Sequence, residues 1–189
     1  MIVFYIFAYA MLAGFFLIEG FLRKGGKDRS KTKFDHSSTA FVSAVMGSSF
    51  ILLFLSLLLD YLHVGTVANL WVGIVGILVG ITGLITRCVA FSTLGRFFTR
   101  TLQETENHVL ITTGIYRYIR HPGYLSDILF FLGVSMTLRN WIPIGFVALT
   151  FPVAYIYRII TEEKMLIEIF GEAYIQYCKH TKRLLPFIF

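Results

Sequence analysis

The sequence has few charged residues, only four prolines and only two cysteines. Charged side chains make up 15% of its 189 residues, whereas an ordinary soluble domain carries about 25%. Cys88 and Cys178 lack the spacing of a zinc or redox motif, and we expect free thiols at both positions. A glycine-rich dinucleotide loop is also missing, which argues against a soluble Rossmann-type nucleotide-binding arrangement. These deficits point away from the common soluble enzyme classes.

Long apolar runs are what the sequence has instead, and hydrophobic residues account for 56% of it. A run of about 20 apolar residues is enough to cross the hydrocarbon core of a bilayer. The sequence therefore predicts an all-α integral membrane protein, a single membrane domain over residues 1–189. About five transmembrane helices are expected, at residues 1–22, 40–59, 67–86, 122–138 and 141–157. Residues 158–189 are too polar to span and form a cytoplasmic C-terminal segment, whose apolar and charged residues alternate with a helical period.

The positive charge of the chain, formally +6, is best explained by membrane topology. Basic residues collect in cytoplasmic loops, and the five predicted spans place every Lys and Arg except Arg139 on one side of the membrane. This distribution predicts an N-terminus outside and a C-terminus in the cytoplasm. A nucleic-acid partner is the weaker interpretation of the same charges, and membrane lipids are the expected surroundings.

Three local features refine this layout. Gly76 and Gly80 form a small-xxx-small pair, which permits close helix packing, more readily within the chain than between two copies. Arg87 ends the third run, where its long side chain is expected to snorkel to the interface. Arg139 and Asn140 form a tight turn, so the fourth and fifth spans should be an antiparallel hairpin.

Polar chemistry concentrates between Gly114 and Tyr124, where the chain reads Gly-Ile-Tyr-Arg-Tyr-Ile-Arg-His-Pro-Gly-Tyr. Pro122 suits the first position of a helix, and the free amides of a helix start favour anionic groups. A second polar stretch follows the fifth run, where Arg158 and Glu162 share one face of a helix because they are four residues apart. Both stretches fall on the cytoplasmic side, so together they predict a cofactor pocket there.

These segments resemble the isoprenylcysteine carboxyl methyltransferase family of integral membrane enzymes, a wider group that includes phospholipid methyltransferases. The resemblance covers the second half of the chain. Its motifs are His108-Val109-Leu110-Ile111, Gly114-x-Tyr116, Arg120-His121-Pro122-Gly123-Tyr124, Glu162-Glu163, Phe170-Gly171-Glu172-x-Tyr174-x-x-Tyr177 and Leu185-Pro186.

The resemblance implies S-adenosylmethionine as methyl donor, with S-adenosylhomocysteine as product. Arg158 would be the catalytic residue that faces a substrate carboxylate, and the substrate would be an isoprenylcysteine-like or other lipophilic carboxylate that enters from the bilayer. The residues expected at the cofactor are His108, Val109, Leu110, Ile111, Tyr116, Arg120, His121, Pro122, Gly123, Tyr124, Glu162 and Glu163. The residue types fit this role, because the cofactor offers a carboxylate, an ammonium, hydroxyls and a sulfonium.

Other interpretations stay open at this level. The nearest enzyme alternative is N-methylation of an amine such as phosphatidylethanolamine, for which Glu163 would be a candidate base. A small transporter or structural membrane protein is the alternative from another class, although no predicted span carries a row of polar residues. Arg120 and Arg158 could also be interface anchors, and the tyrosines an aromatic belt. No metal site is expected, since His108, His121 and Glu162 lack a ligand spacing. The oligomeric state is open.

Overall fold

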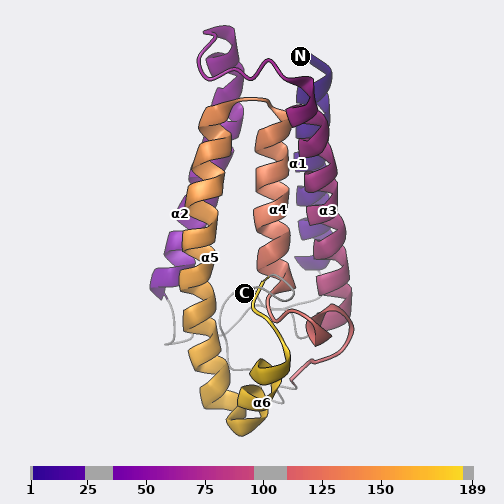
Figure 1. Cartoon of the computed structure of the whole chain (residues 1–189), viewed down its shortest axis with the longest axis vertical. Helices are drawn as coiled ribbons and strands as arrows, with labels where there is room; N and C mark the ends of the chain where they lie inside the picture. The colour runs from indigo at the N-terminus through magenta and orange to yellow at the C-terminus, as the bar shows by residue number, and fades with distance from the viewer. Residues whose placement is uncertain (1, 24–35, 96–109, 185–189) are drawn as a thin grey trace.

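The computed structural model describes residues 2–23, 36–95 and 110–184 as a bundle of helices (Figure 1). Within these ranges the only β-type pairings are two isolated bridges, Thr66 with Asn140 and Ile119 with Lys182. The elements in chain order are α1 (Ile2–Arg23), α2 (His36–Tyr61), α3 (Leu70–Leu94), the 3₁₀ turn η2 (Gly114–Arg117), α4 (Pro122–Thr137), α5 (Trp141–Phe170) and α6 (Glu172–His180).

Four of these helices, α1, α2, α3 and α5, are long and apolar enough to cross a membrane. Large apolar side chains cover their outer faces, as the lipid phase requires. The all-helical membrane fold is therefore confirmed. The 16 residues of α4 give about 24 Å of helix, less than the ~30 Å hydrocarbon core. A fifth crossing through α4 stays a prediction.

Two helices continue beyond the membrane spans predicted for them. The third span, predicted over residues 67–86, is part of a helix that runs to Leu94, and the fifth, predicted over residues 141–157, is part of a helix that runs to Phe170. The predicted spans ended at the first charged side chain, and a charge does not interrupt backbone hydrogen bonding. The helices stop at Gly95 and Gly171, whose positive φ angles (53° and 55°) favour glycine because it has no Cβ. Residues 158–170 are consequently part of the same helix as the fifth predicted span.

The tightest packing in the bundle joins α3 to α4 through glycine. A Cβ atom added at Gly76 would lie 2.4 Å from the backbone nitrogen of Thr137, and one at Gly133 would lie 2.2 Å from that of Gly80. These separations are possible only because no side chain stands between the backbones. The expectation that Gly76 and Gly80 pack within the chain is confirmed.

Substitution of Gly133 should therefore destabilise the bundle. Gly133→Ala forces α3 and α4 apart, because the new methyl group meets backbone that cannot rotate away, and we expect a loss of about 1–3 kcal/mol of unfolding free energy. Gly47→Ala in α2 is the matched control, since no atom lies within 4 Å of its added Cβ. Thermal unfolding in detergent should show a lower Tm for Gly133→Ala alone; an equal Tm in both variants would contradict this packing.

The α4–α5 hairpin turns as predicted and is joined to the α2–α3 loop. The Asn140 side chain accepts from the amide of Ile142 at 3.0 Å and donates to the carbonyl of Val64 at 2.8 Å, while Nη2 of Arg139 donates to the carbonyls of Val67 and Ala68 at 2.6 Å. These two loops and the N-terminus lie at one end of the bundle, and η2, α6 and the C-terminal segment lie at the other (Figure 1).

Arg87 does not snorkel, contrary to the expectation from its place after an apolar run. It is buried and paired with carboxylates from two other helices: Nε donates to Glu19 at 2.7 Å and Nη1 to Asp127 at 2.5 Å. The other oxygen of Asp127 accepts from the hydroxyl of Tyr155 at 2.8 Å. Opposite charges remove the reason for the arginine to reach water. The cluster joins α1, α3, α4 and α5 in the half of α4 that follows Pro122.

Candidate cofactor and substrate site

The segment before α4 is held by the C-terminal strand-like stretch. Arg120 donates its backbone N–H to the carbonyl of Lys182 at 2.7 Å, and His121 donates to that of Arg183 at 3.0 Å. The hydroxyl of Tyr177 in α6 donates to the carbonyl of Tyr116 at 2.5 Å. The segment before α4 and the described residues after α6 thus lie side by side.

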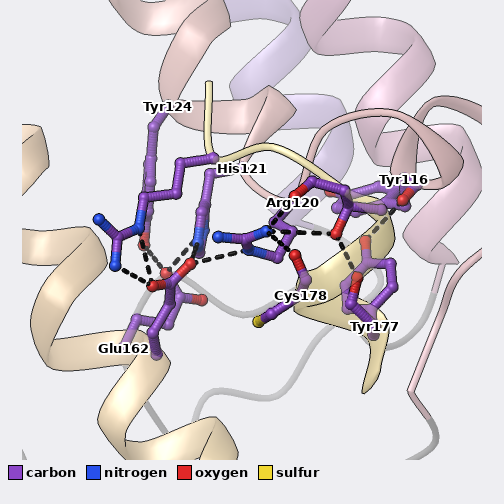
Figure 2. A network of polar contacts seen from close by, with 10 residues as sticks. Tyr116, Arg120, His121, Tyr124, Glu162, Tyr177 and Cys178 are labelled. Carbon is purple, nitrogen blue, oxygen red and sulfur yellow. Dashed lines mark hydrogen bonds and ion pairs between the residues drawn. The ribbon is translucent and has the colours of Figure 1, made fainter. Parts of the chain in front are cut away.

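α4 begins at Pro122, as predicted, and His121 is its N-cap residue. The rings of His121 and Tyr124 stack with their centroids 5.5 Å apart and 8° between their planes. Tyr124 in turn packs on Tyr155, with centroids 5.0 Å apart. This stack presents one imidazole and one phenol to the facing turn of α5, where Glu162 lies (Figure 2).

The two adjacent carboxylates of α5 have different partners. Glu163 accepts from Nε of Arg120 at 2.8 Å and from Nη2 of Arg183 at 2.8 Å, so each of its oxygens faces a guanidinium. Glu162 accepts from the hydroxyl of Tyr124 at 2.6 Å. Its side chain is 22% exposed against 9% for Glu163. Glu163 organises the surrounding segments, whereas Glu162 keeps the more open position.

His121 lies between these carboxylates and takes its charge state from them. Its Nδ1 is 3.4 Å from Glu162 and its Nε2 is 3.4 Å from Glu163. Burial alone would lower the pKa of His121, but the hydrogen bonds and negative charges of the two glutamates outweigh it, and the pKa is raised above 6.5. The imidazolium therefore persists to a higher pH than in an exposed histidine.

This shift predicts a pH-dependent contribution of His121 to stability. Because the folded-state pKa lies above the unfolded value of about 6.5, protonated His121 stabilises the fold fully at a pH below the unfolded value. This contribution is lost as the pH rises through the folded-state pKa. The Tm advantage of the wild type over His121→Asn should therefore be largest near pH 6 and shrink toward pH 9. Thermal unfolding in detergent measures it, with exposed His180→Asn as control. A constant gap would contradict the ionic role of His121.

Arg158 is buried, 4% exposed, and is bonded from two sides. Its Nε donates to the hydroxyl of Tyr124 at 3.3 Å, and its Nη1 donates to Ser38 at 3.0 Å and Thr39 at 2.6 Å. Tyr124 thus joins Arg158 to Glu162, the two residues that the helical spacing placed on one face. The predicted residues Arg158, Glu162, His121 and Tyr124 form one connected group.

The remaining predicted residues differ in their surroundings. Gly123 faces open space, since an added Cβ would meet no atom within 4 Å. Tyr116 is buried, and burial raises its pKa. Leu110 and Ile111 are half-buried at the start of a described range, and His108 and Val109 lie outside the described residues. That each of these contacts a cofactor stays a prediction.

Sequence reasoning missed three residues that the fold adds to the site. Ser38 and Thr39 come from the beginning of α2, and Arg183 comes from the C-terminal segment. The Ser37-Ser38-Thr39 run at the start of an apolar span was the available signal for the first two. Tyr155, at the start of the second polar stretch that the sequence indicated, backs the Tyr124 ring.

Long apolar helices that end in a connected group of arginine, histidine, tyrosine and glutamate define an integral membrane protein with a polar site at one end of its bundle. Residues 74–168 match the model of the isoprenylcysteine carboxyl methyltransferase family. The chain belongs to this family.

Its relatives support the assignment over most of the chain. The chain is 32% identical over 161 residues to protein-S-isoprenylcysteine O-methyltransferase A of Arabidopsis thaliana, covering 80% of this chain and 81% of the relative. It is 34% identical over 122 residues to the Homo sapiens protein-S-isoprenylcysteine O-methyltransferase, covering 62% of this chain and 42% of that one.

A solved structure is similar as well, that of the eukaryotic intramembrane Ras methyltransferase named isoprenylcysteine carboxyl methyltransferase. The TM-score is 0.64 at 29% identity, and the match covers 82% of this chain and 55% of the solved chain. The chain spans about half the length of the human relative and of this solved protein.

Proposed function

We propose that this protein is an S-adenosylmethionine-dependent methyltransferase that methylates the carboxylate of an isoprenylcysteine-like lipophilic substrate. The observation that carries the proposal is the connected group Arg158, Tyr124 and Glu162. It offers a cation for an anionic substrate beside a partly open carboxylate for a cationic cofactor, and all three residues lie within the family match. The methyltransferase names of the relatives support the same reaction.

The described residues fit the cofactor's functional groups. Glu162 would accept from its ammonium or ribose hydroxyls, and the first amides of α4, with Gly123 leaving room for close approach, would bind its carboxylate. Tyr116 and Tyr124 would line the adenine or face the sulfonium. When bound, the cofactor supplies a methyl group on a positively charged sulfur. His108, Val109, Leu110, Ile111, Arg120, His121 and Pro122 complete the proposed lining, while Glu163 acts mainly by holding Arg120 and Arg183 in place.

Arg158 would bind and orient the substrate carboxylate. A carboxyl at the end of a peptide has a reference pKa of about 3.3–3.7, so it is ionised at neutral pH and needs no general base. The guanidinium keeps its charge and offers a planar set of donors. The protein then contributes alignment of carboxylate and methyl group and partial exclusion of water.

The proposed site faces the cytoplasm, with the N-terminus on the opposite side. In the predicted topology every Lys and Arg except Arg139 lies on the side of the membrane that holds this site, as the positive-inside rule describes for cytoplasmic loops. The lipid part of a prenylated substrate would reach the site from the bilayer between helices. The substrate would therefore enter through the lipids that surround the helices.

Amine methylation is disfavoured by the surroundings of Glu163. Both of its oxygens accept from arginines, and a carboxylate paired in this way is a poor proton acceptor. A phospholipid amine would need such an acceptor before it could attack. The rate for a carboxylate substrate should accordingly be flat across neutral pH, whereas an amine substrate would give a rate that rises with pH.

The direct test is methyl transfer by purified protein in lipid vesicles. Radiolabelled S-adenosylmethionine is supplied with an N-acetyl-S-prenylcysteine, with its carboxamide as matched control, and with phosphatidylethanolamine. The proposal expects a base-labile methyl ester on the carboxylate only. Label on the phospholipid, or none on the acid from protein that binds S-adenosylhomocysteine, would overturn it.

A further inference from the structure

The beginning of α2 approaches the proposed substrate arginine. Ser38 and Thr39 both bond to Nη1 of Arg158, although they lie 120 and 119 residues away in the sequence. Next to them, the hydroxyl of Ser37 is 3.1 Å from that of Tyr157. Ser38 and Thr39 precede position 74, where the family match begins. The N-terminal half thus contributes to the polar end of the bundle.

From these contacts we infer that Ser38 and Thr39 are positioning residues, which set the orientation of the Arg158 guanidinium toward the substrate carboxylate. The inference rests on the proposed function and adds to it the part played by α2. It places the determinants of carboxylate recognition on three helices, α2, α4 and α5.

The contacts fix the plane of the guanidinium. Tyr124 of α4 accepts from Nε, and the two hydroxyls of α2 accept from Nη1, so the planar group is fastened at two of its nitrogens by two different helices. A planar group held at two points has lost rotation about its terminal bonds. Carboxylate recognition by arginine depends on that plane, because all the N–H donors of the guanidinium lie in it.

The hydrogen bond between Ser38 and Arg158 is buried. Ser38 is 0% exposed and Arg158 is 4% exposed, so the bonds between them form away from competing water. A hydrogen bond to a charged group is stronger than one between neutral groups. Its loss should therefore change how Arg158 meets a substrate.

The test compares substitutions that remove a hydroxyl with one that keeps it. Thr39→Val preserves the shape of the side chain and removes its oxygen, Thr39→Ser keeps the oxygen, and Ser38→Ala tests the second contact. We expect Thr39→Val and Ser38→Ala each to lower kcat/KM for the N-acetyl-S-prenylcysteine about 10-fold, mainly through KM. Thr39→Ser should stay within about 3-fold of the wild type, and the affinity for S-adenosylhomocysteine should change less than 2-fold in all three.

Thr161→Val is the matched control for loss of a hydroxyl. Thr161 lies on the same helix as Arg158, and its hydroxyl donates to the carbonyl of Tyr157 at 3.1 Å. This variant should have wild-type kinetics. A similar loss of kcat/KM in Thr161→Val would assign the effect to α5 in general and overturn the positioning role.

A double-mutant cycle separates action through Arg158 from direct contact with substrate. In an Arg158→Lys background, Thr39→Val should cause little further loss, because its partner is already changed. Full additivity would overturn the inference, as would wild-type kinetics in both Thr39→Val and Ser38→Ala. If the wild type itself methylates no carboxylate, the proposed function has failed; if it does and these variants match it, only the positioning role has failed.

Discussion

Glu162→Ala should abolish measurable binding of S-adenosylmethionine and S-adenosylhomocysteine. The carboxylate is the more open of the adjacent pair and already accepts a 2.6 Å hydrogen bond from Tyr124. Each hydrogen bond between a charged carboxylate and the cofactor contributes about 1.5–3 kcal/mol. Loss of two such bonds lowers the affinity at least about 100-fold. Isothermal calorimetry with S-adenosylhomocysteine measures it directly.

Two further variants make this result specific to the charge of Glu162. Glu162→Gln keeps the size and one acceptor oxygen, so it should bind more weakly than wild type but better than Glu162→Ala. Glu168→Gln changes an exposed glutamate on the same helix and should bind as the wild type does. Wild-type affinity in Glu162→Ala would remove this carboxylate from the proposed cofactor site.

The sequence was most informative where a local rule acts alone. Pro122 predicted the start of α4 because its ring fixes φ and lacks an N–H, and the structure begins the helix there. Gly76 and Gly80 predicted close packing because a missing side chain is itself the contact surface. Arg139 and Asn140 predicted the hairpin turn because these two polar residues separate two apolar runs, and Arg139 has a positive φ in the structure.

Hydropathy was misleading where charges are compensated by tertiary contacts. Arg87 was placed at the interface because an isolated guanidinium is costly in an apolar bundle, yet Glu19 and Asp127 supply the compensation from other helices. The fifth span was predicted to end before Arg158 for a similar reason, with a helical segment after it. In the structure α5 continues to Phe170, so Arg158, Glu162 and Glu163 lie on the same helix as that span, beside the beginning of α4.

Partners from distant segments could not be read from spacing. Helical periodicity relates residues three or four apart, whereas Ser38 meets Arg158 across 120 residues and Glu163 meets Arg120 across 43. The motif order identified the residue types of the site. Only the fold assigns Glu163 to two arginines and leaves Glu162 with Tyr124 and His121.

Arg158→Ala should leave cofactor binding nearly intact and reduce methyl transfer to a prenylcysteine carboxylate about 100-fold or more in kcat/KM. The guanidinium is the charged donor beside Tyr124, and removing a donor that orients and charge-pairs a reacting anion costs about 3 kcal/mol or more. Arg158→Lys keeps the charge but loses the planar donor set that meets Ser38, Thr39 and Tyr124. Its kcat/KM should therefore lie between those of Arg158→Ala and the wild type.

Binding and turnover measured on the same preparations distinguish this role from the role of Glu162. Lys164→Ala, an exposed cation on the same helix, should retain wild-type turnover and corrects for loss of positive charge near the membrane surface. S-adenosylhomocysteine should bind Arg158→Ala within about 3-fold of its wild-type affinity, since Glu162 keeps its contacts with Tyr124 and His121. If Arg158→Ala and Glu162→Ala lost cofactor affinity equally, the two side chains would form one undivided binding site, and the assignment of Arg158 to the substrate carboxylate would be wrong.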